Sequence, residues 1–320
     1  MRQRDRPRFD RREQVVIASP QDRQALWLAQ NRPTASVPYS GPARTIAIAS
    51  GKGGVGKTNI AVNLGLCLSQ RGKRVLVFDA DMGLANVDVI LGLRVGRTLR
   101  DVVAGVCQLK DILVETPGGI WLAPGGCGLA ELINLDGFSR GRLLQQLADL
   151  ESSFDFVLVD AAAGVGEDVV QFLRSVGEVL VVTTPEPTAL TDAYALIKVA
   201  AAGGGVSHFA MVVNNARDAK DGQEAARRLQ GVTERFLGLS VPLWGIVPFC
   251  DEVPAAVMQQ RPALIAYPDS AFARAIAQIA RQMLAQSGEP IRDRSGLSGA
   301  LRGFLERLSS GRLAVAGKDA

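Results

Sequence analysis

The sequence predicts an α/β fold in three layers (α/β/α), with helices on both faces of a doubly wound, mostly parallel sheet. Most strand candidates are continuous Val, Ile, Leu and Ala runs, which is typical of strands covered on both faces. Helical segments separate these runs, so that successive strands form right-handed βαβ units. A glycine-rich loop lies between the first strand candidate and the first long helix. The strand candidates are residues 44–49, 73–78, 119–123, 154–159, 178–183, 208–213 and 244–247.

The glycine-rich loop, residues 50–58, reads SGKGGVGKT and contains the phosphate-binding pattern G-x-x-x-x-G-K-[ST]. Glycines let backbone N–H groups curl around phosphate oxygens, Lys57 can reach the β- and γ-phosphates, and the Thr58 hydroxyl can bind Mg²⁺. A buried strand precedes the loop and a helical pattern over residues 59–71 follows it, which disfavours a glycine-rich turn without a ligand. The sequence therefore predicts a P-loop NTPase whose phosphate-binding residues are Gly53, Gly54, Val55, Gly56, Lys57 and Thr58.

Composition limits the kind of protein and the kind of site. The 320 residues fit one large domain or two smaller ones, and the 47% that are hydrophobic can form a sizeable core. The four cysteines are far apart without a C-x-x-C pair, so we expect reduced thiols in a cytosolic protein. His208 is the only histidine, which excludes a multi-histidine metal centre. No run of about 18 apolar residues occurs, so we expect no membrane-spanning segment.

The N-terminal region is basic, and its composition differs from that of the rest of the chain. We expect disorder over residues 1–12, a short helix over residues 19–30 and a linker over residues 31–42. Arginines in the first twelve residues could contact nucleic acid, but Phe9 is the only aromatic there for base stacking, so nucleic acid is an unlikely partner. The predicted regions are the N-terminal region (1–43), the P-loop domain (44–285) and a C-terminal tail (286–320).

Two further motifs place carboxylates at the ends of strand candidates. Asp79 and Asp81 follow an apolar run one βαβ step after the P-loop, where carboxylates can serve a magnesium shell and orient an attacking water. Asp160 ends the run FVLV, the usual form of the second magnesium-binding strand, and Gly164 would let the backbone approach the γ-phosphate. The alternatives are an ordinary acidic turn for the first motif and a buried strand ending in a solvated aspartate for the second.

With these motifs the chain resembles the MinD/ParA group of ATPases. The early lysine of KGGVGKT, residues 52–58, is similar to that group's deviant phosphate loop. Within the group, the chain looks like the flagellar-number regulators of the FlhG/FleN family. This resemblance runs from about residue 45 to about residue 285. It rests on DADMGLANVD (79–88), PGGIWLAPGG (117–126) and, most specifically, TPEPTALTDAYALIK (184–198).

The resemblance implies ATP and Mg²⁺ as cofactors and assigns roles around the P-loop. Lys52 would reach across a dimer interface to the partner's nucleotide, and Asp81 would position the hydrolytic water, which makes these two the implied catalytic residues. Lys57 would neutralise the β/γ-phosphates. Thr58 would bind Mg²⁺ directly and Asp160 would hold it through water.

The resemblance also implies a site for the base. Asn214 would read the adenine edge, and the loop with Pro248 and Asp251 would flank the base. The chain departs from the family at Ala161, where a Thr or Ser usually follows the aspartate. This departure puts one hydroxyl contact in the second magnesium segment in doubt, and with it the hydrolysis rate, whereas nucleotide binding is expected to survive.

The C-terminal tail contains an amphipathic helix over residues 297–308. Its five apolar residues fall on one stripe of about 100°. Gly299 and Gly303 weaken a free helix by about 1 kcal/mol each, so the helix needs a surface to fold against. We expect a membrane-surface helix, which the family resemblance supports, and a helix docked on the protein's own core is the alternative. The stripe consists of Leu297, Leu301, Phe304, Leu305 and Leu308.

Near the N-terminus, a short segment loosely resembles the helix by which this family stimulates a signal-recognition-type flagellar GTPase. Gln24, Ala25 and Leu28 carry the likeness, while Arg23 and Ala29 depart from the pattern. A plain surface helix is the alternative.

The expected function is that of an ATP hydrolase which dimerises with ATP, associates reversibly with membranes and regulates flagellar number or placement. Expected partners are a second copy, the flagellar GTPase, flagellar basal-body components and an anionic membrane surface. The expected location is cytoplasmic and peripheral on the inner face of the cell membrane. A chromosome- or plasmid-partitioning ATPase is one alternative, which predicts a basic face near the C-terminus where an amphipathic stripe lies instead. A nucleotide-bound adaptor with negligible turnover is another, hinted at only by Ala161.

Overall fold

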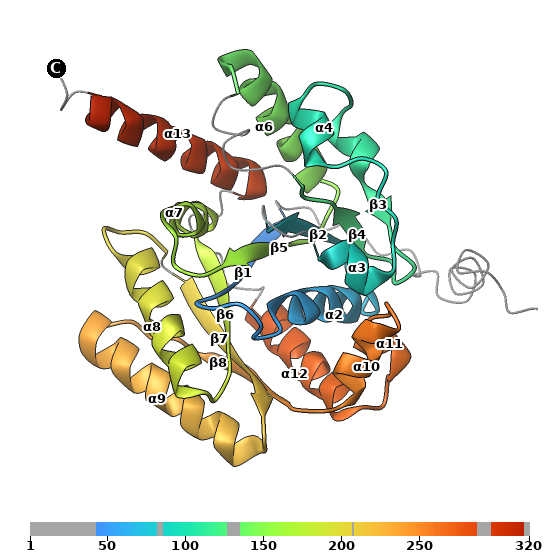
Figure 1. Cartoon of the computed structure of the whole chain (residues 1–320), viewed down its shortest axis with the longest axis vertical. Coiled ribbons are helices and arrows are strands. Elements are labelled where there is room, and N and C mark those ends of the chain that lie inside the picture. The colour runs from blue at the N-terminus through green and yellow to red at the C-terminus, as the bar shows by residue number, and fades with distance from the viewer. Residues whose placement is uncertain (1–42, 82–85, 127–134, 207, 287–295, 317–320) are drawn as a thin grey trace, which may run out of the picture.

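An eight-stranded sheet forms the centre of the molecule, and helices cover both of its faces (Figure 1). The computed structural model describes residues 43–81, 86–126, 135–206, 208–286 and 296–316, with side chains described up to residue 306. The strands are β1 (Arg44–Ser50), β2 (Val75–Ala80), β3 (Val114–Glu115), β4 (Trp121–Ala123), β5 (Phe156–Ala163), β6 (Glu178–Thr183), β7 (His208–Ala216) and β8 (Leu243–Pro248).

The strand order confirms the predicted doubly wound, mostly parallel sheet. Across the sheet the order is β3-β4-β2-β5-β1-β6-β7-β8, and every neighbouring pair is parallel except β3 and β4. The strand β1 lies inside the sheet, with β5 on one side and β6 on the other. The chain moves in opposite directions from this point, which is where open parallel sheets bind ligands beyond the carboxyl ends of their strands.

The helices form two layers because side chains alternate between the two faces of each strand. In β1, for example, Ile46 and Ile48 join one apolar cluster and Ala47 and Ala49 join the other. One layer contains α2 (Lys57–Ser69), α3 (Val87–Leu91), α10 (Glu252–Met258), α11 (Ala263–Ala266) and α12 (Ala271–Ala285). The other contains α4 (Leu99–Val103), α6 (Gly137–Glu151), α7 (Glu167–Val176), α8 (Pro187–Ala201), α9 (Ala219–Leu237) and α13 (Gly296–Ala316), and a 3-10 turn, η1 (Leu109–Ile112), lies beside it.

All seven predicted strands are present, six of them with shifted ends and β6 with the predicted ends, and β3 was not predicted. It is two residues long and lacks the continuous apolar run that identified the others. Strand β5 also runs on past Asp160 to Ala163, further than the predicted end at residue 159. The predicted N-terminal helix, residues 19–30, lies outside the described residues.

The C-terminal helix differs from the sequence expectation. In α13, Leu297, Leu301, Phe304 and Leu305 are all buried in the core cluster against α6 and α7. Figure 1 shows α13 beside these two helices. In this conformation the protein's own core covers the stripe, as in the alternative weighed above, and binding of the helix to a membrane remains a prediction.

The docking of α13 also changes the predicted domain boundary. The Phe304 ring meets Phe172 of α7 edge-on, with ring centroids 5.9 Å apart and an angle of 81° between planes. At least the first turns of α13 thus belong to the core that was expected to end at residue 285. The side chain of Leu308, the last member of the predicted stripe, lies outside the described residues. Among the described helices, none has the length and apolar character needed to cross a bilayer.

A buried ion pair holds β1 to β6 at the end of the sheet away from the glycine loop. The Arg44 guanidinium pairs with Glu178, with Nε and Oε2 3.0 Å apart. It also donates a 2.6 Å hydrogen bond to the carbonyl of Met283 at the end of α12. The same group lies 5.8 Å from the centroid of the Trp244 ring on β8. One side chain therefore connects three strands and a helix.

We expect Arg44→Ala to lower the free energy of unfolding by about 3–5 kcal/mol, because it leaves the Glu178 carboxylate buried without its partner. Urea denaturation followed by circular dichroism measures the change. The matched control is Arg217→Ala, which removes an exposed ion pair with Asp221 and should cost less than about 1 kcal/mol. Equal losses in the two variants would contradict the role given to Arg44.

Candidate functional site

The P-loop connects the carboxyl end of β1 to the first turn of α2. Gly54 and Gly56 have φ angles of +78° and +87°, which glycine adopts without strain. The Ser50 hydroxyl donates a 2.9 Å hydrogen bond to the carbonyl of Lys52 and so ties the start of the loop to itself. The loop is therefore held open at the N-terminus of a 13-residue helix, where backbone N–H groups and the helix dipole favour an anion.

The outer side of the P-loop rests directly on α8. A Cβ built on Gly51 would lie 2.2 Å from the backbone carbonyl of Asp192. No side chain fits in that space, so position 51 requires glycine. This close approach fixes the loop against the helix that follows β6.

Three predicted site residues come together at the start of α2. Lys57 and Asp160 form an ion pair of 2.6 Å, and both side chains are buried. The Thr58 side chain also hydrogen-bonds the Asp160 carboxylate. The structure thus brings the predicted phosphate lysine and both predicted metal residues into one cluster.

A second carboxylate, Asp79, stands beside this cluster. Asp79 and Asp160 are register partners on β2 and β5, so strand alternation directs both toward α2. Burial, together with the charge of Asp160, raises the pKa of Asp79 to about 7. Burial also raises the pKa of Asp160, and the charge of Lys57 opposes that rise. Neighbouring carboxylates with raised pKa values are groups that a hard cation stabilises.

Asp81 follows directly after β2 at the edge of the same cluster. It is partly exposed, and its backbone N–H donates to the Asp79 carboxylate at 3.1 Å. Its charge acts on Asp160, which shows that the two carboxylates are close. Asp81 thus lies near Asp160 and open to solvent, and its water-positioning role remains a prediction.

Lys52 does not point toward Lys57 and Asp160. Its Nζ donates to Glu186 at 2.7 Å and to Thr188 at 3.2 Å, at the start of α8. The side chain is 33% exposed, and the pair with Glu186 lowers the pKa of that carboxylate. Sequence reasoning singled out the segment 184–198 but missed both contacts, since they join residues more than 130 positions apart.

Asn214 is placed differently from its predicted role. Its side-chain amide donates a 2.8 Å hydrogen bond to the carbonyl of Val55, so it ties β7 to the P-loop. It also packs so close to Gly56 that a Cβ there would lie 2.3 Å from the amide nitrogen. The adenine-reading role remains a prediction, and the structural role of Asn214 was not foreseen.

The residue after it, Asn215, lines an open cavity of about 440 Å³ beside the P-loop. Asn215 has a φ of +54°, a conformation that asparagine tolerates better than most residues. Sequence reasoning missed Asn215 and Arg217, for which the only signal was their position after a strand that ends at the site. Pro248 and Asp251 lie at the end of β8 and before α10 and are not among the lining residues, so their contact with a base remains a prediction. The lining residues are Lys52, Gly54, Val55, Thr184, Pro185, Glu186, Asn215, Arg217 and Asp221.

Ala161, the departure from the family pattern, lies on the opposite side of the sheet from the magnesium residues. It is 1% exposed and belongs to the apolar cluster under α6, α7 and α13. Asp160 points toward α2 instead, where it meets Lys57. A hydroxyl at position 161 would therefore not lie beside Thr58, so its absence does not remove a magnesium contact.

The cluster suits a nucleoside triphosphate with Mg²⁺. Positive-φ glycines leave the loop N–H groups free of Cβ atoms, Lys57 supplies a buried positive charge, and Thr58 with Asp160 supplies hard oxygen ligands. Mg²⁺ bound there would neutralise phosphate charge. Within the described residues, no group of three or more His, Cys, Asp or Glu side chains is arranged to hold a metal ion by itself.

Comparisons with known proteins agree with this site. A family model described as an AAA domain matches residues 43–202. The chain is 41% identical over 267 residues to the antiactivator FleN of Pseudomonas aeruginosa, covering 83% of this chain and 94% of that protein. It is 35% identical to the flagellum site-determining protein YlxH of Helicobacter pylori, covering 75% and 81% of the two chains.

Solved structures of MinD have the same fold. The cell division ATPase MinD of Pyrococcus furiosus matches with a TM-score of 0.64 and 29% identity, over 77% of this chain and 100% of that one. MinD of Pyrococcus horikoshii, solved in complex with Mg-ADP, matches with a TM-score of 0.64 and 28% identity, over 77% and 98%.

The fold and the P-loop cluster define a P-loop ATPase of the MinD/ParA type. Lys52, at the front of the loop, is the lysine that marks the deviant phosphate loop of this class. Within the class, the chain belongs to the FleN/FlhG family.

The raised pKa of Asp79 gives the nucleotide-free protein a specific pH dependence. The pKa of Asp79 is about 7 in the folded protein and 3.8 as the ordinary value of an unfolded chain, so the folded state binds the proton more tightly. Protonated Asp79 therefore stabilises the folded state, and ionised Asp79 does not. Its contribution is complete below pH 4 and is lost as the pH rises through about 7. We expect Asp79→Asn, which stays neutral, to gain about 1 kcal/mol relative to wild type between pH 6 and pH 8.

Urea unfolding in EDTA at both pH values measures this difference. The Asn side chain keeps the oxygen that accepts the Asp81 N–H, so the comparison isolates the charge. A constant difference between wild type and Asp79→Asn across this pH range would contradict the assigned pKa.

Proposed function

We propose that this protein is a Mg²⁺-dependent ATP hydrolase that dimerises with ATP and regulates flagellar number or placement. The relatives named antiactivator FleN and flagellum site-determining protein YlxH support the flagellar role. The cluster of Lys57, Thr58 and Asp160 supports nucleotide binding, and Asp81 at its solvent edge supports hydrolysis. A stimulated flagellar GTPase and basal-body components remain proposed partners.

The observation that carries the dimer proposal is the position of Lys52. The lysine lies at the protein surface and is held by Glu186 and Thr188 rather than by the phosphate cluster of its own subunit. An exposed ion pair of this kind is worth at most about 1 kcal/mol. A triphosphate on a second subunit offers stronger, charge-assisted hydrogen bonds. Lys52 can therefore leave Glu186 for the partner's nucleotide at little cost.

We expect Lys52→Ala to bind ATP but stay monomeric, because it loses the contact that crosses between subunits. Asp81→Ala should bind ATP, stall before hydrolysis and accumulate as a dimer, because only water positioning is removed. Light scattering after size exclusion gives the oligomeric state, and phosphate release gives turnover. Lys198→Ala, an exposed lysine at the other end of α8, is the matched control and should dimerise normally.

Dimerisation of Lys52→Ala at the wild-type ATP concentration would overturn the role of Lys52. Normal hydrolysis by Asp81→Ala would overturn the role of Asp81.

We also propose that α13 is a reversible membrane anchor which the core holds in the nucleotide-free state. Its docked stripe buries Leu297, Leu301, Phe304 and Leu305, and each such side chain is worth about 1.5–3 kcal/mol on burial. A lipid surface would bury the same stripe after release. Two released helices on one dimer bind with a high effective concentration, so dimerisation strengthens a weak anchor.

The connection from β5 to α7 supports coupling between nucleotide and α13. After Asp160 the chain reaches Gly164, whose N–H donates 2.8 Å to the Ser50 carbonyl at the root of the P-loop. Helix α7 begins three residues later, and its Phe172 contacts Phe304. A nucleotide that shifts the segment around Gly164 therefore acts on the helix that holds α13.

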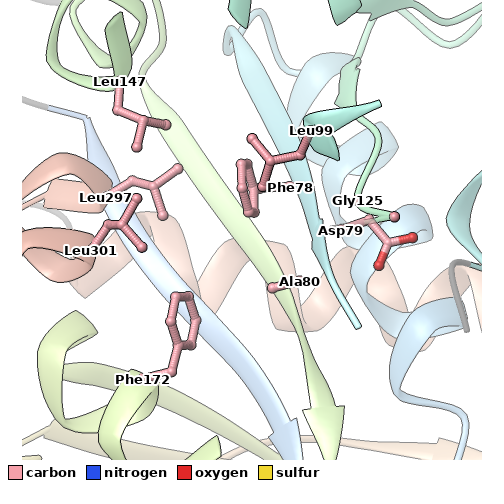
Figure 2. A pocket seen from close by; sticks show the side chains of 10 residues that line it. Phe78, Asp79, Ala80, Leu99, Gly125, Leu147, Phe172, Leu297 and Leu301 are labelled. Carbon is pink, nitrogen blue, oxygen red and sulfur yellow. The ribbon is translucent and has the colours of Figure 1, made fainter. Parts of the chain in front are cut away.

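The packing between α13 and the sheet is incomplete near the site. A cavity of about 20 Å³, large enough for one water molecule, lies under the first turns of α13. Figure 2 shows Leu297 and Leu301 of α13 facing Leu147, Phe172 and Phe78 on β2, while the Asp79 carboxylate points to the other side of the strand. This gap lowers the stability of the docked state at the first turns of α13.

We expect a disulfide between Ser175→Cys and Gly303→Cys to prevent ATP-dependent binding to anionic vesicles. A Cβ at position 303 would lie 3.9 Å from the Cβ of Ser175, which is within the range for disulfides, so the bond clamps α13 onto α7. Vesicle co-sedimentation measures binding, and the same variant after reduction is the control. Equal sedimentation of the oxidised and reduced protein would contradict the proposed release.

A further inference from the structure

Glu151, the last residue of α6, lies directly under the first turn of α13. Its carboxylate accepts hydrogen bonds from the backbone N–H groups of Leu297 and Ser298, the second at 3.2 Å. It also accepts a 2.6 Å hydrogen bond from the Ser298 hydroxyl. Helix N-termini leave backbone donors without intrahelical partners, and here a residue 146 positions earlier satisfies two of them.

This carboxylate is an unusual group to bury at this position. Glu151 is 8% exposed, and burial raises its pKa. No arginine or lysine among the described residues forms an ion pair with it. Its hydrogen bonds to α13, the Thr45 side chain and the positive end of the helix dipole offset the cost of burying the charge.

The start of α13 is shaped to fit this carboxylate. Gly296 has a φ of +63°, and a Cβ there would lie 2.5 Å from one Glu151 oxygen and 2.8 Å from the other. Glycine is thus required both by the backbone conformation and by the approach of the carboxylate. The contact therefore combines a carboxylate at the end of α6 with a glycine at the start of α13, two segments that are distant in sequence.

The apolar packing beside the contact is incomplete. Leu297, whose N–H reaches Glu151, also lines the water-sized cavity under α13 (Figure 2). The first turn of α13 therefore depends on the Glu151 cap. The turn that contains Phe304 depends on it less, because Phe304 is fully buried against Phe172.

We propose that Glu151 is the positioning residue that holds α13 on the core, through a latch formed by its carboxylate and residues 296–298. The latch ties the first turn while α13 is docked. It opens readily because Glu151 regains water when α13 leaves, which a purely apolar contact would not do. This inference rests on the proposed anchor role of α13 and names the residue that regulates it.

Hydrogen exchange in full-length, lipid-free protein tests the latch. Glu151→Ala should speed exchange of the amides in the first turns of α13 by about five- to thirty-fold, the usual effect of losing a helix cap. Glu151→Gln, which keeps an acceptor but no charge, should fall between Ala and wild type. Asp149→Ala is the matched control, since this exposed carboxylate on the same helix contacts Gln145 at 2.8 Å and not α13.

Exchange in β1 and β5 and binding of Mg-ATP should stay at wild-type levels, which separates release of α13 from general unfolding. If Glu151→Ala fails to fold, Gly296→Ala tests the same contact from the side of α13 and should speed the same amides. Wild-type exchange of α13 in Glu151→Ala, or in Gly296→Ala where the first variant does not fold, would overturn the latch.

Co-sedimentation with vesicles of phosphatidylglycerol and phosphatidylethanolamine then separates the two proposals. At the same ATP concentration, a larger fraction of Glu151→Ala than of wild type should sediment with these vesicles. Faster exchange of α13 without vesicle binding would support the latch while contradicting the membrane role of α13.

Discussion

Lys57 and Asp160 form a buried ion pair that joins the first turn of α2 to the middle of the sheet. Burying two charges is costly unless they meet directly, so β5 must lie beside β1 for the pair to form. Thr58 is positioned by its hydrogen bond to Asp160. Asp79 lies beside the pair because it is the register partner of Asp160 on β2. The site is therefore already assembled from the protein's own residues, and the charges of Lys57 and Asp160 neutralise each other.

Strand alternation extends the influence of this pair to the opposite side of the sheet. Asp160 points toward α2, while the next residue, Ala161, packs into the cluster beneath α6, α7 and α13. One strand thus presents its charged residue to the nucleotide and its apolar residues to the C-terminal helix. Any shift of β5 that follows a change at the phosphate side is transmitted to both layers, because the core is close-packed.

The sequence was sufficient to predict the sheet and the P-loop cluster, since both depend on local patterns. Continuous apolar runs identify buried strands. Lys57 and Thr58 belong to the motif that follows β1, and Asp160 belongs to the motif on β5. The stripe of α13 predicted a helix but not its partner, because an apolar face is equally satisfied by lipid or by α6 and α7. The contacts of Lys52 with Glu186 and of Asn214 with Val55 were also missed, since each joins distant segments.

The contact of Gly51 with α8 has a kinetic consequence. Because the loop backbone lies against the carbonyl of Asp192, the proposed movement of Lys52 toward a second subunit requires only rotation of its own side-chain torsions. Such rotations take picoseconds to nanoseconds at a protein surface, far less than a loop rearrangement. The rate at which two ATP-bound subunits join should then be second order in protein and set by their diffusional encounter, with no slow unimolecular step contributed by the P-loop.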